Sequence, residues 1–368
     1  MIESIEPAID PKNRMDFLID WELTLKCNLD CSYCTDSAEM DGGHWTLAKH
    51  PPVDECLKTV DFLYRYTDLY MQTKQKFSRR AVLNVYGGES LLHPNIVEIL
   101  QHARDMHTYD WPLTVTTTTN AIIGARRMRE IIPLIDKFTL SYHTDSLPKQ
   151  KELFKENALE IKTQGQSSKI IIMMTNDYSK WDELTAMIQW CKDNKIDYLA
   201  KQLDNKHPSK VYNLAQLAWF ANEYKQDLDY ADGTNLSEKG RGCCGGRGLC
   251  TNDNLKDRKN WIPRVNFEGW SCSVNHYFLF VKQNDGRIFV NKDCRMNFNG
   301  KVEPIGTLQN SGVLLAETKQ RLSAKEMPLM TCAKTRCLCG ICAPKASTLE
   351  HTKQIMSKHT VNQAWQIN

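Results

Sequence analysis

The sequence predicts an α/β protein with a largely parallel sheet, followed by a smaller cysteine-rich segment. Through the first 230 residues, short runs rich in β-branched and aromatic residues alternate six times with stretches whose apolar residues recur at helical spacing. Strands that alternate with helices pair in parallel through right-handed crossovers. Beyond residue 240 this rhythm stops, and nine of the fourteen cysteines lie there. The pattern leaves open a doubly wound sheet or a partial barrel; in both, functional groups gather at the carboxyl ends of the strands.

Each element is expected from its own local pattern. Strands are predicted at 17–25, 80–86, 113–119, 137–142, 169–175 and 196–202. Helices are predicted at 53–72, 95–106, 125–133, 149–163, 179–194 and 211–226. In the second segment, "NDG" at 284–286 separates two apolar runs and predicts a hairpin. A last helix is expected at 345–364, so the predicted units are 1–232, 233–344 and 345–368.

Composition restricts the class of protein. The chain has 368 residues, of which 41% are hydrophobic, so a packed core is expected. We find no secretory signal and no apolar run of about 18 residues, which favours a cytoplasmic protein without a membrane span. In a reducing compartment, fourteen cysteines indicate metal ligation rather than disulfides.

Three cysteines lie close together directly after the first predicted strand, in "LTLKCNLDCSYCTDS". They are Cys27, Cys31 and Cys34. A closed zinc site needs four ligands, and the nearest further candidate, His44, is ten residues beyond Cys34. Three thiolates on a [4Fe–4S] cluster leave one iron open to a substrate or cofactor. A zinc site remains the alternative.

The spacing Cys27-x-x-x-Cys31-x-x-Cys34, with Tyr33 before the last cysteine, resembles the radical S-adenosylmethionine (radical SAM) superfamily. The resemblance covers roughly residues 15–230 and implies a partial (β/α)6 TIM-like barrel. It also implies that S-adenosylmethionine binds the open iron and is cleaved reductively to a 5′-deoxyadenosyl radical, which abstracts a hydrogen atom from the substrate. The enzyme would be an oxidoreductase, isomerase or transferase, with an electron donor such as flavodoxin or ferredoxin.

The ends of the next strands extend the resemblance. "YGGES" is similar to the family's GGE motif, which holds the methionine ammonium group. The resemblance implies these S-adenosylmethionine contacts: Tyr33, Gly87, Gly88, Glu89, Asn120, Ser141 and His143. Simpler interpretations stay open, namely a strand-end turn at the two glycines, a helix cap at Asn120 and a core histidine at His143. Cys56 and Cys191 lie on apolar helix stripes and are interpreted as core thiols.

The second cysteine set resembles the SPASM and twitch extensions of radical SAM enzymes, in which cysteines flank a hairpin and a cysteine cluster follows. The expected ligands of one or two auxiliary iron–sulfur clusters are Cys243, Cys244, Cys250, Cys272, Cys294, Cys332, Cys337, Cys339 and Cys342. The final spacing and the Cys243-Cys244 pair depart from the family pattern, so the ligand assignment stays open. One cluster plus a zinc ion, zinc alone, or a purely structural role are the alternatives.

Charge points to an anionic partner. From residue 239 onward, 20 Lys and Arg face 9 Asp and Glu, a balance of +11, while residues 1–238 carry −8. Arg241 and Arg247 lie on a glycine-rich loop, and Trp261, Phe267 and Trp270 alternate with basic residues. We therefore favour a nucleic acid as substrate, and the resemblance to radical SAM enzymes implies a modified nucleobase in RNA or phage DNA. A peptide or protein maturase of the RiPP type is the runner-up, and a non-catalytic iron–sulfur or zinc protein is the alternative from another class.

Overall fold

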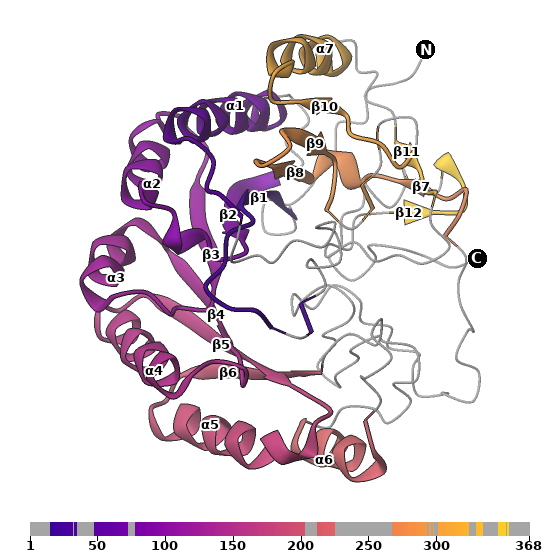
Figure 1. Cartoon of the computed structure of the whole chain (residues 1–368). Helices are drawn as coiled ribbons and strands as arrows, with labels where there is room; N and C mark the ends of the chain where they lie inside the picture. Colours follow the sequence, from indigo (N-terminus) through magenta and orange to yellow (C-terminus); the bar gives the residue numbers. More distant parts are fainter. Residues whose placement is uncertain are drawn as a thin grey trace.

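The computed structural model describes residues 15–31, 33–34, 48–72, 78–202, 212–224, 267–292, 294–295, 297, 301–323, 329–333, 345–350 and 352. Six parallel strands alternate with helices, and the sheet curves into an open arc (Figure 1). The strands are β1 (Met15–Thr24), β2 (Ser78–Gly87), β3 (Leu113–Thr119), β4 (Lys137–Tyr142), β5 (Ser167–Met174) and β6 (Asp197–Gln202). The helices are α1 (Val53–Met71), α2 (Ile96–Asp105), α3 (Ala125–Ile131), α4 (Pro148–Thr163), α5 (Trp181–Asp193) and α6 (Leu214–Tyr224).

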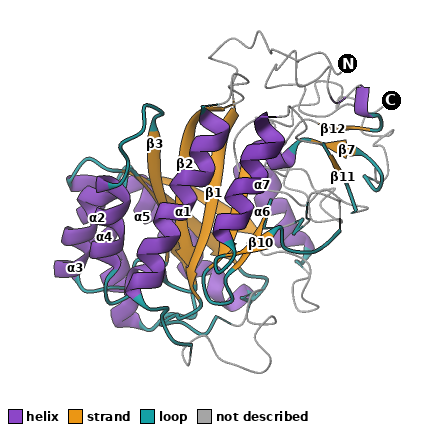
Figure 2. Ribbon diagram, turned by 90° about the horizontal axis from the view of Figure 1, so that it is seen from above, coloured by secondary structure: helices purple, strands orange, loops and turns teal. Residues whose placement is uncertain are grey.

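The strand order decides between the two architectures that the sequence left open. β1 to β6 lie side by side in chain order, and each neighbouring pair is parallel. A doubly wound sheet reverses its strand order and carries helices on both faces. Here α1 to α6 follow the outer, convex side of the arc (Figure 1), and Figure 2 shows helices beside the sheet from a second direction. The fold is therefore α/β of the partial TIM-like barrel type, as the resemblance implied.

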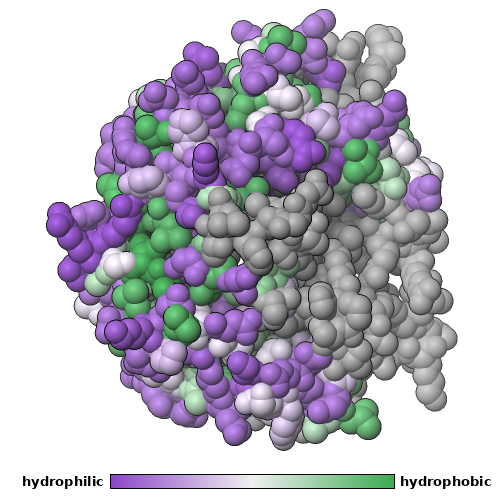
Figure 3. Space-filling view, in the orientation of Figure 1, coloured by the Kyte–Doolittle hydropathy of each residue, from purple (hydrophilic) through white to green (hydrophobic). Residues whose placement is uncertain are grey.

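The main core lies between this sheet and its helices. β1 illustrates the cause, because Phe17, Ile19, Trp21 and Leu23 alternate along the strand and all four are fully buried. Helix α1 buries Cys56, Val60 and Leu63 on the facing stripe. In Figure 3, polar side chains dominate the outer rim formed by the helices. Cys56 and Cys191 are fully buried, which confirms their interpretation as core thiols.

The predicted hairpin forms and joins the barrel sheet. Its strands are β8 (Phe278–Lys282) and β9 (Arg287–Phe289), and Gly286 between them has φ +68°, a value that glycine adopts without strain. β8 pairs with β1 in parallel, and β10 (Gly306–Thr307) pairs with β9. The nine-stranded sheet therefore runs β10-β9-β8-β1-β2-β3-β4-β5-β6. A hairpin from the cysteine-rich segment is thus part of the core sheet.

The rest of the described cysteine-rich segment is small. Helix α7 (Ser311–Ser323), which no sequence pattern predicted, packs against α1. A second sheet has β7 (Ser271–Cys272) between β11 (Met330–Thr331) and β12 (Lys345–Ala346). The helix predicted at 345–364 is therefore wrong at its start, because Lys345 and Ala346 pair with β7 instead. Short 3-10 turns cover Ser90–Leu92, Ile132–Leu134, Tyr178–Lys180 and Val274–His276. Among the described residues, no helix has the length and apolarity that crossing a membrane requires.

Candidate functional site

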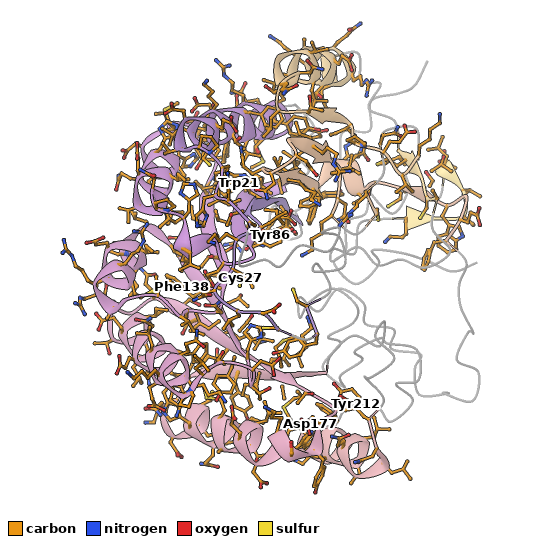
Figure 4. All side chains as sticks on the ribbon, in the orientation of Figure 1. Trp21, Cys27, Tyr86, Phe138, Asp177 and Tyr212 are labelled. Atoms are coloured by element: carbon orange, nitrogen blue, oxygen red, sulfur yellow. The ribbon has the colours of Figure 1, made fainter. Side chains whose placement is uncertain are left out.

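The three-cysteine loop begins where β1 ends. Cys27, Cys31 and Cys34 are all partly buried, and a turn joins the last two through a 3.0 Å hydrogen bond from Cys34 N to Cys31 O. Tyr86, which is labelled together with Cys27 in Figure 4, lies on the neighbouring strand β2 directly before Gly87. Because parallel strands end at one edge of the sheet, the loop lies where the fold class predicts a site.

Gly87 and Gly88 let the end of β2 pack against the backbone that leads to Cys27. A Cβ on Gly87 would lie 2.0 Å from Thr24 O, and one on Gly88 would lie 2.5 Å from Leu25 O. Gly87 also has φ +152°. The contact is hydrogen-bonded, since Gly88 N donates to Thr24 O at 2.8 Å. Only glycine permits this approach, which explains the two glycines physically.

The Glu89 carboxylate is fully buried and binds protein donors. Oε1 accepts hydrogen bonds from Thr119 Oγ1 at 2.8 Å and Leu91 N at 3.1 Å. Oε2 accepts one from Asn120 N at 2.6 Å. Burial raises the pKa of this carboxyl to about 7, although the three hydrogen bonds oppose the shift. The side chain therefore ties the turn after β2 to the end of β3.

Asn120 joins the end of β3 to the cysteine loop. Its Nδ2 donates to Asn28 Oδ1 at 2.8 Å and lies 3.8 Å from Cys27 Sγ. Asn28 Nδ2 in turn donates to Ile122 O at 2.8 Å. Asn28 was not predicted as a site residue, because a polar residue within a cysteine loop carries no local signal of a partner 92 positions away.

A buried side chain of α4 supports the loop that follows β3. Asn157 Nδ2 donates to Ala121 O and Ile123 O, both at 2.8 Å. Ala121 itself has φ +54°, which is uncommon for a residue other than glycine. Only a weak indication of this role for Asn157 was present in the sequence, namely a polar residue in the middle of the helix predicted at 149–163. The strained turn after β3 is thus held from two sides.

Tyr33 and His143 meet above Cys31. The Tyr33 hydroxyl lies 2.8 Å from His143 Nδ1, the two rings stack with centroids 5.8 Å apart, and Cys31 Sγ lies 3.6 Å from the same nitrogen. Burial lowers the pKa of His143 to about 4, so the imidazole is neutral at physiological pH. Ser141 is half-buried on β4, whereas Tyr142 points to the opposite face and donates to Glu183. The structure therefore brings His143, at the end of β4, to Tyr33 and Cys31 of the cysteine loop.

Burial raises the pKa of the Cys27 thiol to about 11 and that of Cys31 to about 12. Nearby acidic groups and the neighbouring thiols add to the effect. A metal cation would favour the thiolates that burial disfavours, and its binding would release protons. Within the described part of the chain, no three His, Cys, Asp or Glu side chains converge as metal ligands. The three thiols are the donor type that an iron–sulfur cluster takes, and they lie at the edge of the sheet where the fold class predicts a site.

Three of the nine C-terminal cysteines lie in the described residues. Cys272 is on β7, Cys294 follows β9 and Cys332 follows β11, and all three are buried in one apolar cluster with residues such as Tyr277 and Phe280. Cys332 is held by backbone hydrogen bonds to residues 269 and 270. The remaining predicted auxiliary ligands and basic contacts lie outside the described residues: Cys243, Cys244, Cys250, Cys337, Cys339, Cys342, Arg241 and Arg247.

Comparison with known proteins gives only distant likenesses. No protein-family model and no curated protein matches the chain. A solved structure described as "Native anSMEcpe with bound AdoMet" is 14% identical, with a TM-score of 0.48 over 83% of this chain and 82% of its own. "Crystal structure of BtrN in complex with AdoMet and 2-DOIA" is 12% identical, with a TM-score of 0.40 over 85% of this chain and 88% of its own. At these scores, any function must be argued from the site itself.

Proposed function

We propose that this chain is a radical SAM enzyme. The observation that carries the proposal is the packing of the Gly87-Gly88-Glu89 turn on the backbone that enters the three-cysteine loop. The glycine turn is thereby in direct contact with the segment that enters the three-cysteine loop, since Gly88 N donates to Thr24 O and Glu89 N donates to Lys26 O. Neither a closed zinc site nor an electron carrier requires such a glycine cradle beside a three-thiol loop.

The cysteines, the glycine turn, Tyr33 and His143 each have a role in this proposal. Cys27, Cys31 and Cys34 would hold a [4Fe–4S] cluster, and the backbone of the glycine turn would hold the amino-acid part of S-adenosylmethionine. When bound, this pair supplies one-electron cleavage of S-adenosylmethionine and hydrogen-atom abstraction from a substrate. Tyr33 and His143 close the loop on its other side, which limits the access of water to Cys31.

The first experiment tests the cluster and the cleavage together. After anaerobic reconstitution with iron and sulfide, the reduced protein should convert S-adenosylmethionine to 5′-deoxyadenosine. Replacing Cys27, Cys31 and Cys34 with alanine should remove about four irons per chain and abolish the product. The matched control is Cys191→Ala, which removes a buried core thiol and should keep both. Unchanged iron content in the triple variant would contradict the proposal.

The same triple variant reports on the auxiliary centres. We propose at least one auxiliary iron–sulfur cluster in the C-terminal segment. This is supported by the burial of Cys272, Cys294 and Cys332 in one small group of packed apolar side chains. The triple variant should then stay brown and keep iron. A colourless protein that contains zinc alone would favour a structural metal site instead.

For the substrate, we favour an anionic macromolecule, a nucleic acid or modified nucleobase, over a peptide. This proposal is supported by the excess of Lys and Arg over Asp and Glu in the C-terminal segment. Ion pairs within the protein reduce the part of that excess that a partner could meet. Lys282 lies 3.8 Å from Glu22, Lys292 lies 3.6 Å from Asp20, and Arg287 contacts Asp285. These charges are neutralised internally, so the basic residues available to a partner are fewer than the sequence suggests. Flavodoxin or ferredoxin remains the proposed electron donor.

A further inference from the structure

Cys27 is approached by N–H groups from two different elements. Leu29 N donates to Cys27 Sγ at 3.4 Å from within the loop, and Asn120 Nδ2 lies 3.8 Å from the same sulfur at the end of β3. Both distances are within the range of hydrogen bonds to sulfur. The Asn120 contact differs from a cofactor contact because it acts on the metal ligand itself.

The Asn120 side chain is held at both of its amide atoms. Oδ1 accepts from Ile122 N at 2.9 Å, which leaves Nδ2 to face Asn28 and Cys27. This pattern also determines which amide atom is nitrogen, since the acceptor Asn28 Oδ1 requires a donor. Only 5% of Asn120 is exposed, so water does not compete for the amide. The donor is therefore placed before any cofactor binds.

Glu89 determines where Asn120 stands. Its carboxylate binds the Asn120 backbone N–H at 2.6 Å and is itself oriented by Thr119 Oγ1 and Leu91 N. A contiguous path of hydrogen bonds thus runs from the turn after β2 through Asn120 to Cys27. Directly after Asn120, Ala121 has φ +54°, which is uncommon for a residue other than glycine.

We infer that Asn120 is a positioning residue that donates a hydrogen bond to the Cys27 sulfur and so raises the reduction potential of the metal centre on this loop, with Glu89 acting through it. This inference rests on the proposed function, which places an iron–sulfur cluster on the three cysteines. Reduction adds negative charge to a thiolate-ligated cluster, and an N–H donor at the sulfur stabilises that charge. Hydrogen bonds to sulfur are among the factors that set cluster potentials.

The test measures the midpoint potential of the loop cluster by redox titration monitored by electron paramagnetic resonance, without S-adenosylmethionine. Asn120→Ala removes the donor without adding charge, and Asn120→Asp keeps the shape and the Ile122 contact but places oxygen toward the sulfur. Both variants should retain iron and titrate at a more negative potential than wild type, with Asn120→Asp shifted further. Glu89→Gln should shift in the same direction. Asn310→Asp, an exposed asparagine before α7, is the control and should match wild type.

Two results would overturn the inference. Full iron content with a wild-type potential in both Asn120 variants would show that the amide does not act on the cluster. Loss of iron from both variants would show that Asn120 only supports the loop. In either case wild type still cleaves S-adenosylmethionine, so the proposed function survives. A wild-type protein that assembles no cluster would instead refute the proposed function, and this inference with it.

Discussion

At the scale of single residues, Gly88 shows how the lack of a side chain lets two backbone segments of the site pack closely. Its backbone occupies the space that a Cβ would need, with Leu25 O at 2.5 Å and Lys26 O at 2.6 Å from that position. Both oxygens belong to the segment that enters the cysteine loop, and backbone atoms cannot rotate away as a side chain could. A methyl group here would therefore displace the loop.

We expect Gly88→Ala to lower the free energy of unfolding by about 1–3 kcal/mol, as overpacking does, and to reduce the iron retained after reconstitution. Chemical denaturation and iron analysis give the two quantities. Gly124→Ala is the matched control, because its Cβ would meet nothing within 4 Å and its φ of −58° suits alanine. Equal behaviour of the two variants would show that the close approach at Gly88 has no importance.

At the scale of elements, β1 serves two surfaces at once. Its outer face is apolar and packs on the helices, whereas its inner face carries Asp20 and Glu22, buried opposite β2 and β8. Asp20 accepts from Asn84 Nδ2 at 2.8 Å and lies 3.6 Å from Lys292. Lys292 also lies over the Tyr86 ring, 5.0 Å from its centroid. Buried charges on β1 thus meet the lysines of the cysteine-rich segment.

Glu22 and Lys282 form the more buried of these pairs, with side chains 9% and 7% exposed. Glu22→Gln should destabilise the protein by about 3 kcal/mol, because it leaves a buried lysine with less compensation. The double variant Glu22→Leu with Lys282→Met should recover most of that loss, since apolar replacement of a whole buried pair is often neutral.

Denaturant unfolding of wild type, Glu22→Leu, Lys282→Met and the double variant provides the coupling free energy. The exposed pair of Arg126 and Glu130 on α3 is the control, as the Arg126 side chain is 91% exposed. Glu130→Gln should change stability by less than about 0.5 kcal/mol. Additive losses in the Glu22 and Lys282 variants would argue against a direct interaction between them.

At the scale of the whole molecule, charge is divided between an acidic first segment and a basic second one. Part of this division is structural, because Glu22 and Asp20 on β1 bind lysines that come from beyond residue 280. These ion pairs between the hairpin segment and β1 also reduce the positive charge that the protein can present to a partner. Arg241 and Arg247, the basic residues expected to contact the substrate, lie outside the described residues.

If the substrate is a nucleic acid, affinity should fall with salt. Three to five phosphate contacts on a single strand give a slope of roughly −2 to −4 for log K against log salt. Arg241→Ala with Arg247→Ala should flatten that slope by about one to two units, measured by fluorescence anisotropy. Arg126→Ala on α3 serves as the control. Binding that is absent at low salt, or independent of salt, would move a peptide substrate to first place.

Local sequence determined the elements and the edge of the sheet on which the site lies. The strands predicted at 113–119 and 137–142 have those bounds in the structure, because β-branched and alternating apolar residues express their preference within a few positions. Cys27, Gly87 and Asn120 were expected at one edge for an equally local reason: each lies at or just beyond the carboxyl end of a parallel strand. The roles of these residues toward a cofactor stay predictions.

Tertiary structure alone decided which distant surfaces meet. The parallel docking of β8 on β1, the pairing of Lys345 and Ala346 with β7, and the Asn28–Asn120 contact each join positions at least 73 residues apart. Such contacts depend on the shape and charge of surfaces that exist only after the elements have formed, so no local sequence pattern predicts them. The same reason explains Glu89: its motif indicated a cofactor contact, but burial against Thr119 and Asn120 directs its carboxylate to the protein.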